Sequence, residues 1–143
     1  MDVRDLATAD YDEAAALWSA TGLTRPWNDP HDDLARACAG PSSTVLGGFL
    51  DGRLVATAMA GHDGHRGWLY YVAVRPELQG RGLGRRITAA AEEWLAARDV
   101  VKVHVMVRTT NTAVLGCYER LGYEPADVRV LAKWLRTPAH PPA

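Results

Sequence analysis

The spacing of apolar and polar residues along the chain predicts helices and short strands in alternation. In the first expected helix, capped by Thr8 or Asp10, the apolar residues Ala14, Leu17 and Trp18 recur at intervals of three and four. The pattern as a whole predicts helices at about 10–22, 29–40, 83–98 and 111–122, and strands at about 2–6, 44–50, 54–60, 68–74, 100–107 and 128–135.

Turn residues set several of these boundaries. Asp51-Gly52 is a dipeptide that favours a two-residue type I′ turn, so strands 44–50 and 54–60 are expected to form a hairpin. Pro76 has no backbone N–H to donate and ends the strand before it. Strands interrupted by helices, with hairpins early and late, predict a mixed sheet in an α/β or α+β domain.

Length and composition restrict the class of protein. The 143 residues, 48% of them hydrophobic, suffice for one domain, which we place at 1–136, with a disordered Pro-rich tail at 137–143. No apolar run approaches the roughly 20 residues of a membrane helix, and the N-terminus has no secretory signal pattern. This N-terminus predicts a cytoplasmic protein, and Cys38 and Cys117 are expected to be free buried thiols, which suits a reducing compartment.

The spacing of the histidines disfavours a metalloprotein, and the net charge disfavours a nonspecific nucleic-acid-binding protein. The five histidines stand at no spacing typical of a metal site, so no metal is expected. A formal net charge of -1 argues against nonspecific nucleic-acid binding. The charge is nevertheless uneven, because residues 1–40 hold eight acidic and three basic residues, whereas residues 61–90 hold two acidic and five basic residues. An anionic ligand is therefore expected near 61–90.

The segment between the strand 68–74 and the helix 83–98 has the composition of an anion-binding loop. Glycines let backbone N–H groups approach a ligand, and a helix N-terminus adds unpaired donors and partial positive charge, which suits a pyrophosphate. The segment lacks the third glycine of the dinucleotide-binding motif and the Gly-Lys-Ser/Thr ending of the nucleotide P-loop, which disfavours NAD and ATP. It reads Gln79-Gly80-Arg81-Gly82-Leu83-Gly84-Arg85-Arg86.

This loop resembles the acetyl-CoA loop of the GNAT N-acetyltransferase superfamily, which reads Gln/Arg-x-x-Gly-x-Gly/Ala. Asn111, seven residues before Tyr118, and the run 118–123 are similar to the second signature of that superfamily. The order of predicted elements fits over nearly all of residues 1–135. The segments 25–30 and 61–67 further resemble a bacterial group of the YpeA type.

The resemblance implies a GNAT fold, which is a mixed, mostly antiparallel sheet of six to seven strands with about four helices. Its central splayed parallel pair would be 68–74 and 100–107, and the pantetheine arm of the donor acetyl-CoA would pair with the backbone of the first of these strands. A main-chain N–H of that strand would stabilise the oxyanion. The residues that the resemblance assigns to acetyl-CoA binding are Val72, Ala73, Val74, Gln79, Gly80, Arg81, Gly82, Leu83, Gly84, Arg85 and Asn111.

The resemblance also implies direct attack of a primary amine on the thioester, with Tyr118 as the general acid that protonates the departing thiolate. At two positions where relatives carry a glutamate as general base, this chain has Met106 and Trp68, and neither side chain accepts a proton. The candidates for the base are therefore Asp63, His62, His65 or a chain of water molecules.

The acceptor side is expected between the first two predicted helices, where the superfamily builds its acceptor pocket. There Trp27, beside Asn28, can stack on a substrate and Arg25 can pair with a carboxylate. Tyr70 and Tyr71 are expected to point to opposite faces of their strand, so that one of them faces the acceptor. The acidic balance of residues 1–40 predicts a cationic acceptor.

Two functions are compatible with these residues. The first is an acetyl-CoA-dependent N-acetyltransferase that acts on a small-molecule or peptide amine, as a monomer or homodimer, without a nucleic-acid or membrane partner. In this function Cys117 is a packed residue and no nucleophile, because no partner base stands near it. The second is a non-catalytic acetyl-CoA-binding module that acts as a sensor or interaction partner. The missing glutamates favour the second function, and the presence of Tyr118 and Asn111 favours the first.

Overall fold

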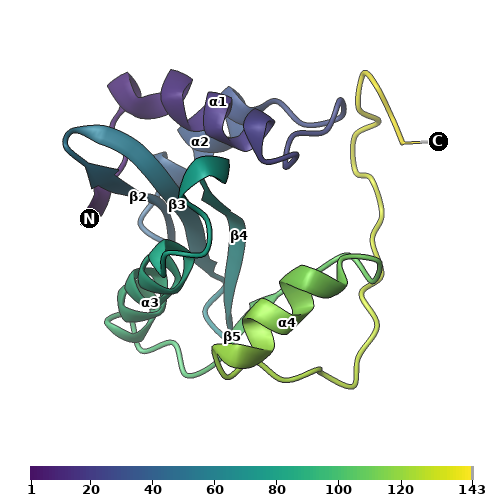
Figure 1. The fold of residues 1–143 in the computed structure, drawn as a ribbon. Helices are drawn as coiled ribbons and strands as arrows, with labels where there is room; N and C mark the ends of the chain where they lie inside the picture. Colours follow the sequence, from purple (N-terminus) through teal and green to yellow (C-terminus); the bar gives the residue numbers. More distant parts are fainter. Residues whose placement is uncertain (143) are drawn as a thin grey trace.

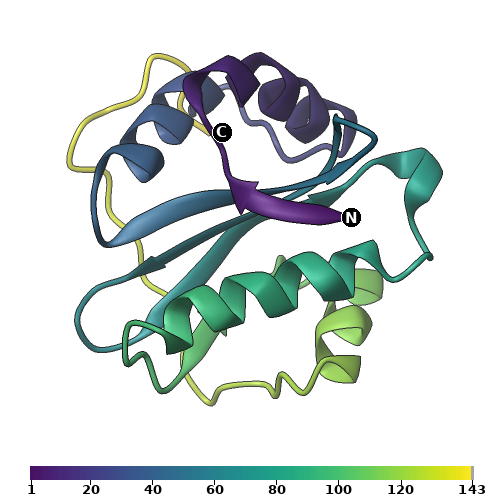
Figure 2. The ribbon, with the colours of Figure 1, turned by 90° about the vertical axis from the view of Figure 1, so that its left-hand side faces the viewer.

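Five strands form one sheet with helices against both of its faces (Figure 1 and Figure 2). The computed structural model describes residues 1–142. The strands lie in the order β1-β2-β3-β4-β5, with antiparallel pairing from β1 to β4 and parallel pairing between β4 and β5. The elements are β1 Asp2–Asp5, η1 Thr8–Asp10, α1 Tyr11–Ala20, α2 Pro30–Ala39, β2 Ser43–Leu50, β3 Arg53–His62, β4 Gly67–Val74, η2 Pro76–Leu78, α3 Leu83–Ala96, β5 Val103–Val105 and α4 Thr112–Arg120.

Local side-chain chemistry explains the start of α2 and the turn between β2 and β3. The Asp29 carboxylate accepts a hydrogen bond from the His31 N–H at 2.9 Å, and Pro30 occupies the first helical position. Asp51 and Gly52 have φ of 48° and 76°, as a type I′ turn requires. The helix start and the hairpin predicted from the sequence are thereby confirmed.

Two apolar cores lie on opposite faces of the sheet. In Figure 2, α1 and α2 cover one face and α3 covers the other. Trp18 and Leu34, both fully buried, belong to the core under α1 and α2, and Ile87 and Leu95 belong to the core under α3. Strand residues complete both cores, and the helical members recur at spacings of three and four, as their pattern predicted.

The parallel pair is splayed, as the resemblance implied. Residues 67–69 of β4 pair with residues 103–105 of β5, where β5 ends while β4 continues to Val74. Within residues 1–142 the β5-facing edge of β4 from Tyr70 onward pairs with no strand. The sheet therefore opens into a gap beside the second half of β4.

A bulge in β4 changes the face that its tyrosines occupy. Met59 pairs with Tyr70 and Thr57 with Ala73, so one residue of β3 lies opposite two residues of β4. Tyr71, within the bulge, has a φ of 48°, which is uncommon for a residue other than glycine. Because the bulge shifts the alternation by one residue, Tyr70 and Tyr71 line the same pocket. The prediction that they point to opposite faces is wrong.

The predicted strand 128–135 does not form. These residues have no regular secondary structure, and Leu131 and Leu135 are 92% and 95% exposed. The three-residue β5 offers few backbone groups to a further strand, and the adjacent apolar residues Val130 and Leu131 break the alternation that a half-buried strand needs. The described sheet consequently has five strands in place of the expected six or seven. Residues 137–142 of the tail are also irregular, and residue 143 lies outside the described residues.

The two cysteines are free thiols, but they are less buried than the sequence predicted. Cys38 is partly buried, whereas Cys117 is exposed on α4. The Sγ of Cys117 accepts a hydrogen bond from the Arg120 guanidinium at 3.2 Å. Among residues 1–142, no helix has both the length and the apolar character needed to cross a membrane. No three His, Cys, Asp or Glu side chains of the same residues converge as metal ligands.

Candidate active site

The glycine-rich loop between β4 and α3 presents backbone donors to open space. Gly80 and Gly82 have φ of 78° and 80°, and a Cβ at either position would meet no atom within 4 Å. Gly82 is the N-cap of α3, and its carbonyl accepts the Arg86 N–H at 3.1 Å. The first-turn N–H groups of residues 83–85 precede this bond and are left to a ligand.

Gly84 occupies a position where the described structure has room for a side-chain Cβ. It lies in the first turn of α3, outside the left-handed region, and a Cβ there would sit at an ordinary 3.6 Å from Val74 Cγ2. Glycine in a helix costs about 0.5–1 kcal/mol relative to alanine. Glycine at this position therefore leaves room above the helix N-terminus, although an alanine would also fit there.

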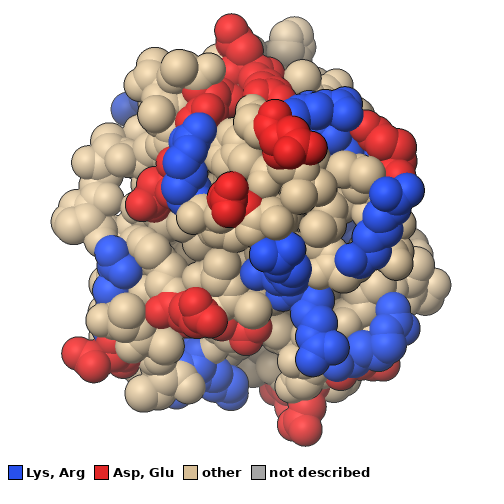
Figure 3. All heavy atoms as spheres, turned by 60° about the vertical axis from the view of Figure 1, so that its left-hand side comes forward, with Lys and Arg blue, Asp and Glu red and all other residues tan. Residues whose placement is uncertain are grey.

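The charges around this loop suit an anion. Residues 75–86 contain four arginines and one glutamate, and Arg81 and Arg85 are exposed without an ion pair to another described residue. Figure 3 shows basic side chains gathered along the right-hand side of the face that it draws. Gln79 closes the loop onto β4, because its Nε2 donates to the Val74 carbonyl at 3.2 Å. The predicted cofactor residues 79–85 thus form one continuous basic segment at the end of β4.

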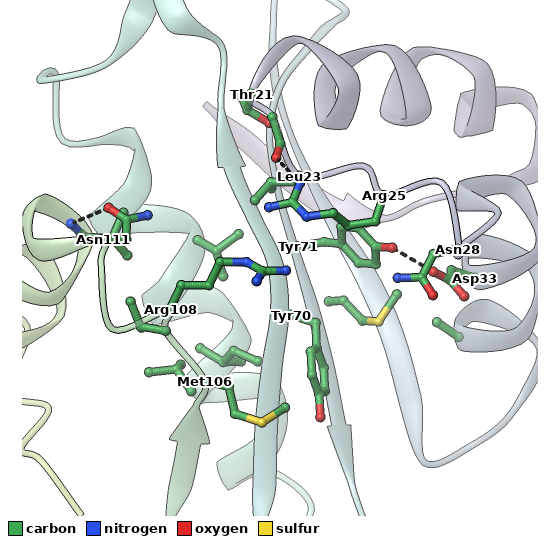
Figure 4. A pocket seen from close by; sticks show the side chains of 18 of the residues that line it. Thr21, Leu23, Arg25, Asn28, Asp33, Tyr70, Tyr71, Met106, Arg108 and Asn111 are labelled. Carbon is green, nitrogen blue, oxygen red and sulfur yellow. Dashed lines mark hydrogen bonds between the residues drawn. The ribbon is translucent and has the colours of Figure 1, made fainter. Parts of the chain in front are cut away.

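A pocket of about 770 Å³ opens beside the gap between β4 and β5 (Figure 4). Its walls are the bulged part of β4, the segment from the end of β5 into α4, and the loop from α1 into α2. The pocket brings together three of the predicted catalytic and cofactor-binding residues, Val72, Asn111 and Tyr118. The loop 79–85 does not line it, and β4 links the two regions.

Tyr118 keeps its proton at neutral pH. Its ring lies edge-on against the ring of Tyr123, with centroids 5.3 Å apart. Burial, and secondarily the neighbouring Cys117, raises the pKa of Tyr118 to about 12. The hydroxyl therefore carries a proton at neutral pH, which the general-acid assignment requires.

Asn111 caps α4, because its Oδ1 accepts a hydrogen bond from the Val114 N–H at 3.3 Å. The amide nitrogen of Asn111 makes no hydrogen bond to the described protein residues. The same side chain can therefore cap the helix and donate to a ligand in the pocket that it lines.

A hydrogen-bond network holds the bulge of β4. The Tyr71 ring stacks on Trp18 with centroids 3.7 Å apart, and Trp18 Nε1 donates to Thr57 Oγ1 at 2.9 Å. Thr57 Oγ1 donates to the Tyr71 carbonyl at 2.9 Å, and the Tyr71 hydroxyl donates to Asp33 Oδ2 at 2.7 Å. Burial and the Asp33 carboxylate raise the pKa of Tyr71 above the ordinary tyrosine value. Sequence reasoning missed Asp33 and Thr57, since no local motif joins residues so distant along the chain.

The expected acceptor residues Arg25, Trp27 and Asn28 line the pocket. Arg36 on α2 and Arg108 in the loop after β5 line it as well, and the sequence reasoning did not identify either of them. The one feature of the sequence that could have indicated a role for Arg108 is its positive charge in the loop just before Asn111, which caps the next helix.

The family profile described as "Acetyltransferase (GNAT) family" matches residues 4–123 of this chain. The chain belongs to the GNAT acetyltransferase family. The family expected from the loop 79–84 and from the Asn111 and Tyr118 signature is thereby confirmed.

Solved structures have the same GNAT fold. A putative acetyltransferase from Agrobacterium tumefaciens superposes with a TM-score of 0.79 at 20% identity, covering 94% of this chain and 100% of that one. The aminoglycoside N-acetyltransferase AAC(6′)-Iy in complex with CoA gives a TM-score of 0.80 at 16% identity, covering 94% and 95%. The ribosomal-protein-S18-alanine N-acetyltransferase from Escherichia coli gives a TM-score of 0.74 at 24% identity, covering 87% and 78%.

The three side chains considered for the general base of this GNAT protein lie outside the pocket. Asp63 Oδ1 accepts the backbone N–H groups of His65 at 2.9 Å and Arg66 at 2.8 Å, and these bonds lower its pKa while they hold the turn before β4. His62 lies against Trp94 of α3, with ring centroids 6.2 Å apart. Their positions give no support to any of them as the base.

At the pocket itself, the position that carries a glutamate in some GNAT relatives holds Met106, which is 49% exposed. Asp33 is the one acidic side chain among the described residues that line the pocket. One of its oxygens is already occupied by the Tyr71 hydroxyl.

Proposed function

We propose that this protein transfers the acetyl group of acetyl-CoA to the nitrogen of a primary amine. The observation that carries the proposal is the pocket beside the splayed strands, because it gathers Val72, Asn111 and Tyr118 next to an unpaired edge of β4. A glycine-rich cradle lies at the end of the same strand. The residues proposed for the cofactor and those proposed for the acceptor thus lie along one strand and at its end.

The residues present fit acetyl-CoA. The N–H groups of residues 83–85, with Arg81 and Arg85, suit the pyrophosphate, and the open space over Gly80 and Gly82 admits it. The unpaired edge of β4 and the amide of Asn111 offer hydrogen bonds to the pantetheine arm. When bound, acetyl-CoA supplies an activated acyl group that needs no covalent enzyme intermediate.

The proposed reaction balances with one proton donor from the protein. The amine nitrogen bonds to the acetyl carbon, the carbon–sulfur bond breaks, and the Tyr118 hydroxyl gives its proton to the departing sulfur. The proton that the nitrogen loses passes to water in the open pocket, and the Tyr118 phenolate takes a proton back from solvent. A backbone N–H of β4 stabilises the negative charge on the acetyl oxygen.

Acetyl-CoA binding and acetyl transfer are tested separately. Calorimetry with CoA measures binding, and the release of free thiol from acetyl-CoA over a panel of primary amines measures transfer. Acetylated product identified by mass spectrometry would support the proposal. Absence of CoA binding would overturn it.

A non-catalytic acetyl-CoA-binding module is the second candidate function. The observation that favours it is that no side chain of residues 1–142 stands free at the pocket as a general base, since Met106 accepts no proton and Asp33 already accepts the Tyr71 hydroxyl. CoA binding without acetyl transfer to any amine of the panel would favour this alternative.

We further propose that the protein is a member of the YpeA-type group, with a single domain over residues 1–136 that works in the cytoplasm as a monomer or homodimer. The segments 25–30 and 61–67 support the group assignment. The free thiols Cys38 and Cys117 support a reducing compartment. Size-exclusion chromatography with light scattering measures the oligomeric state.

A further inference from the structure

The charged side chains that line the pocket are mainly basic. Arg25, Arg36 and Arg108 line it together with one carboxylate, Asp33. No ion pair joins any of the three arginines to an acidic residue within residues 1–142. Lysine and histidine are absent from the described lining, so these arginines determine its positive charge.

The acidic balance of residues 1–40 does not extend to this pocket. Of the eight acidic residues there, seven do not line it, and most of these are bound to other protein groups. The carboxylate of Asp29 caps α2, and that of Asp5 accepts the Thr44 hydroxyl. Asp10, Asp12 and Glu13 pair with Arg4, His31 and Arg75 at 2.7, 2.8 and 3.2 Å. Two basic residues of the mainly acidic segment 1–40, Arg25 and Arg36, therefore line the pocket, whereas most of the carboxylates of that segment do not.

Arg25 is held in position before any ligand binds. Its Nη1 donates to the carbonyls of Gly22 at 2.7 Å and Thr24 at 2.8 Å, and the side chain is half-buried in the loop after α1. The remaining guanidinium N–H groups are free to bind a ligand. Figure 4 shows Arg25 and Arg108 reaching into the pocket from opposite walls. Little side-chain entropy is lost when a ligand binds an arginine fixed in this way.

We propose that the acceptor is a primary amine that also carries a carboxylate, and that Arg25 and Arg108 bind this carboxylate. The inference rests on the proposed acetyl transfer, because it assigns the acceptor of that reaction. Arg36 also lines the pocket and adds positive charge there. A guanidinium presents two parallel donors that match the two oxygens of a carboxylate, which gives both affinity and orientation.

Polycationic acceptors suit this pocket poorly. The fold is shared with structures described as aminoglycoside N-acetyltransferases, and aminoglycosides carry several ammonium groups. Three arginines against one aspartate would repel such a substrate, and the aspartate already accepts a hydrogen bond from Tyr71. The sequence-based expectation of a cationic acceptor is therefore not supported at the pocket.

Matched amine pairs test the charge preference. Each pair consists of an amino acid and the amine formed by its decarboxylation, such as lysine with cadaverine, histidine with histamine and phenylalanine with phenethylamine. Two pairs of C-terminally amidated tripeptides that differ only by Glu or Gln after the free N-terminal residue extend the test to peptides. The release of free thiol from acetyl-CoA gives kcat/KM for each amine. Calorimetry with the CoA-loaded protein gives the Kd of each amine even where acetyl transfer is slow. We expect the carboxylate-bearing member to be favoured about ten- to hundredfold in at least one pair.

Charge variants test the residues. Arg108→Gln and Arg25→Gln should each raise KM for the preferred carboxylate-bearing acceptor about tenfold, while KM for acetyl-CoA changes less than about twofold. Arg98→Gln is the matched control, because Arg98 lies over the Trp94 ring and does not line the pocket. Arg108→Glu should reverse the preference within every amine pair in which the unaltered protein favours the carboxylate-bearing member.

The outcomes separate the two proposals. Equal or stronger use of the decarboxylated amines, or no binding of either member of any pair to the CoA-loaded protein, would overturn the carboxylate inference while leaving acetyl-CoA binding intact. An equal rise in KM for acetyl-CoA in Arg108→Gln would assign that arginine to the cofactor and also overturn it. Failure to bind CoA at all would overturn the proposed function first.

Discussion

The Tyr71 hydroxyl donates a 2.7 Å hydrogen bond to the Asp33 carboxylate and so joins the bulge of β4 to α2. From the other side, Thr57 of β3 donates to the Tyr71 carbonyl at 2.9 Å. The bulge is therefore fixed at both its backbone and its side chain. Because β4 continues from this bulge along the gap that faces β5, the pair positions the strand edge proposed to bind acetyl-CoA.

Tyr71→Phe should lower the free energy of unfolding by about 2 kcal/mol, since the variant loses a part-buried hydrogen bond to a charged group. The ring stack on Trp18 remains, so the fold itself should persist. Denaturant unfolding followed by tryptophan fluorescence measures the change. Tyr70→Phe is the matched control for stability, because the Tyr70 hydroxyl makes no hydrogen bond to a described residue, and its effect should stay within about 0.5 kcal/mol. Equal effects of the two variants would contradict a role for the Asp33 bond.

Tyr118→Phe should reduce kcat for acetyl transfer by about a hundred- to ten-thousandfold, because the general acid is lost while the ring and its packing remain. The Kd for CoA should change little. Tyr123→Phe is the control, because the Tyr123 hydroxyl is buried without a hydrogen-bond partner in the described structure and its removal leaves the ring contact with Tyr118. Single-turnover kinetics of the chemical step measure the effect. Wild-type rates in Tyr118→Phe would exclude it as the acid.

The pH dependence of acetyl transfer should carry the signature of a protonated tyrosine. Burial raises the pKa of Tyr118 to about 12, so the proton donor stays intact well above the ordinary tyrosine pKa of about 10. Attack needs the neutral amine, and kcat/KM should therefore rise with pH until the acceptor amine is deprotonated and then stay level. Rate profiles over about pH 6 to 10.5, in the range where the fold is intact by circular dichroism, test this. A descending limb below pH 10 that disappears in Tyr118→Phe would contradict the raised pKa.

Features that depend on neighbouring residues were predictable from the sequence, and features that depend on distant contacts were not. The Asp29 cap, the Asp51-Gly52 turn and the loop 79–85 are each encoded within a few residues. The bulge at Tyr71 depends on partners in β3 and α2, which no local alternation reveals.

The charge of the pocket and the fate of the predicted strand 128–135 also depend on contacts between residues that are distant in the sequence. Counting acidic residues over 1–40 could not show that Arg25 and Arg36 line the pocket while seven of the eight carboxylates do not. The apolar residues of 128–135 read as a strand, but a strand also needs a neighbour to pair with, and β5 ends after three residues.

Gly84→Ala should stabilise the protein and weaken CoA binding, which would show that the ligand and not the fold requires glycine at this position. A Cβ at this position lies 3.6 Å from Val74, an ordinary contact, and alanine favours the helix, so the free energy of unfolding should rise by about 0.5–1 kcal/mol. The added methyl group narrows the space above the α3 N-terminus, where the pyrophosphate is proposed to approach. The Kd for CoA should therefore increase at least about tenfold, a loss of roughly 1.4 kcal/mol of binding free energy, measured by calorimetry.

Gly116→Ala provides the control for this change. Gly116 lies within α4, where a Cβ would meet only the end of the Arg120 side chain at an ordinary 3.6 Å, so the same gain in stability is expected without a change in the Kd for CoA. If Gly84→Ala instead lowered stability, the helix start would need the glycine for its own structure. If it raised stability and bound CoA as tightly as the unaltered protein, no close approach of the ligand to residue 84 would be needed. Only greater stability together with weaker CoA binding assigns this glycine to the ligand.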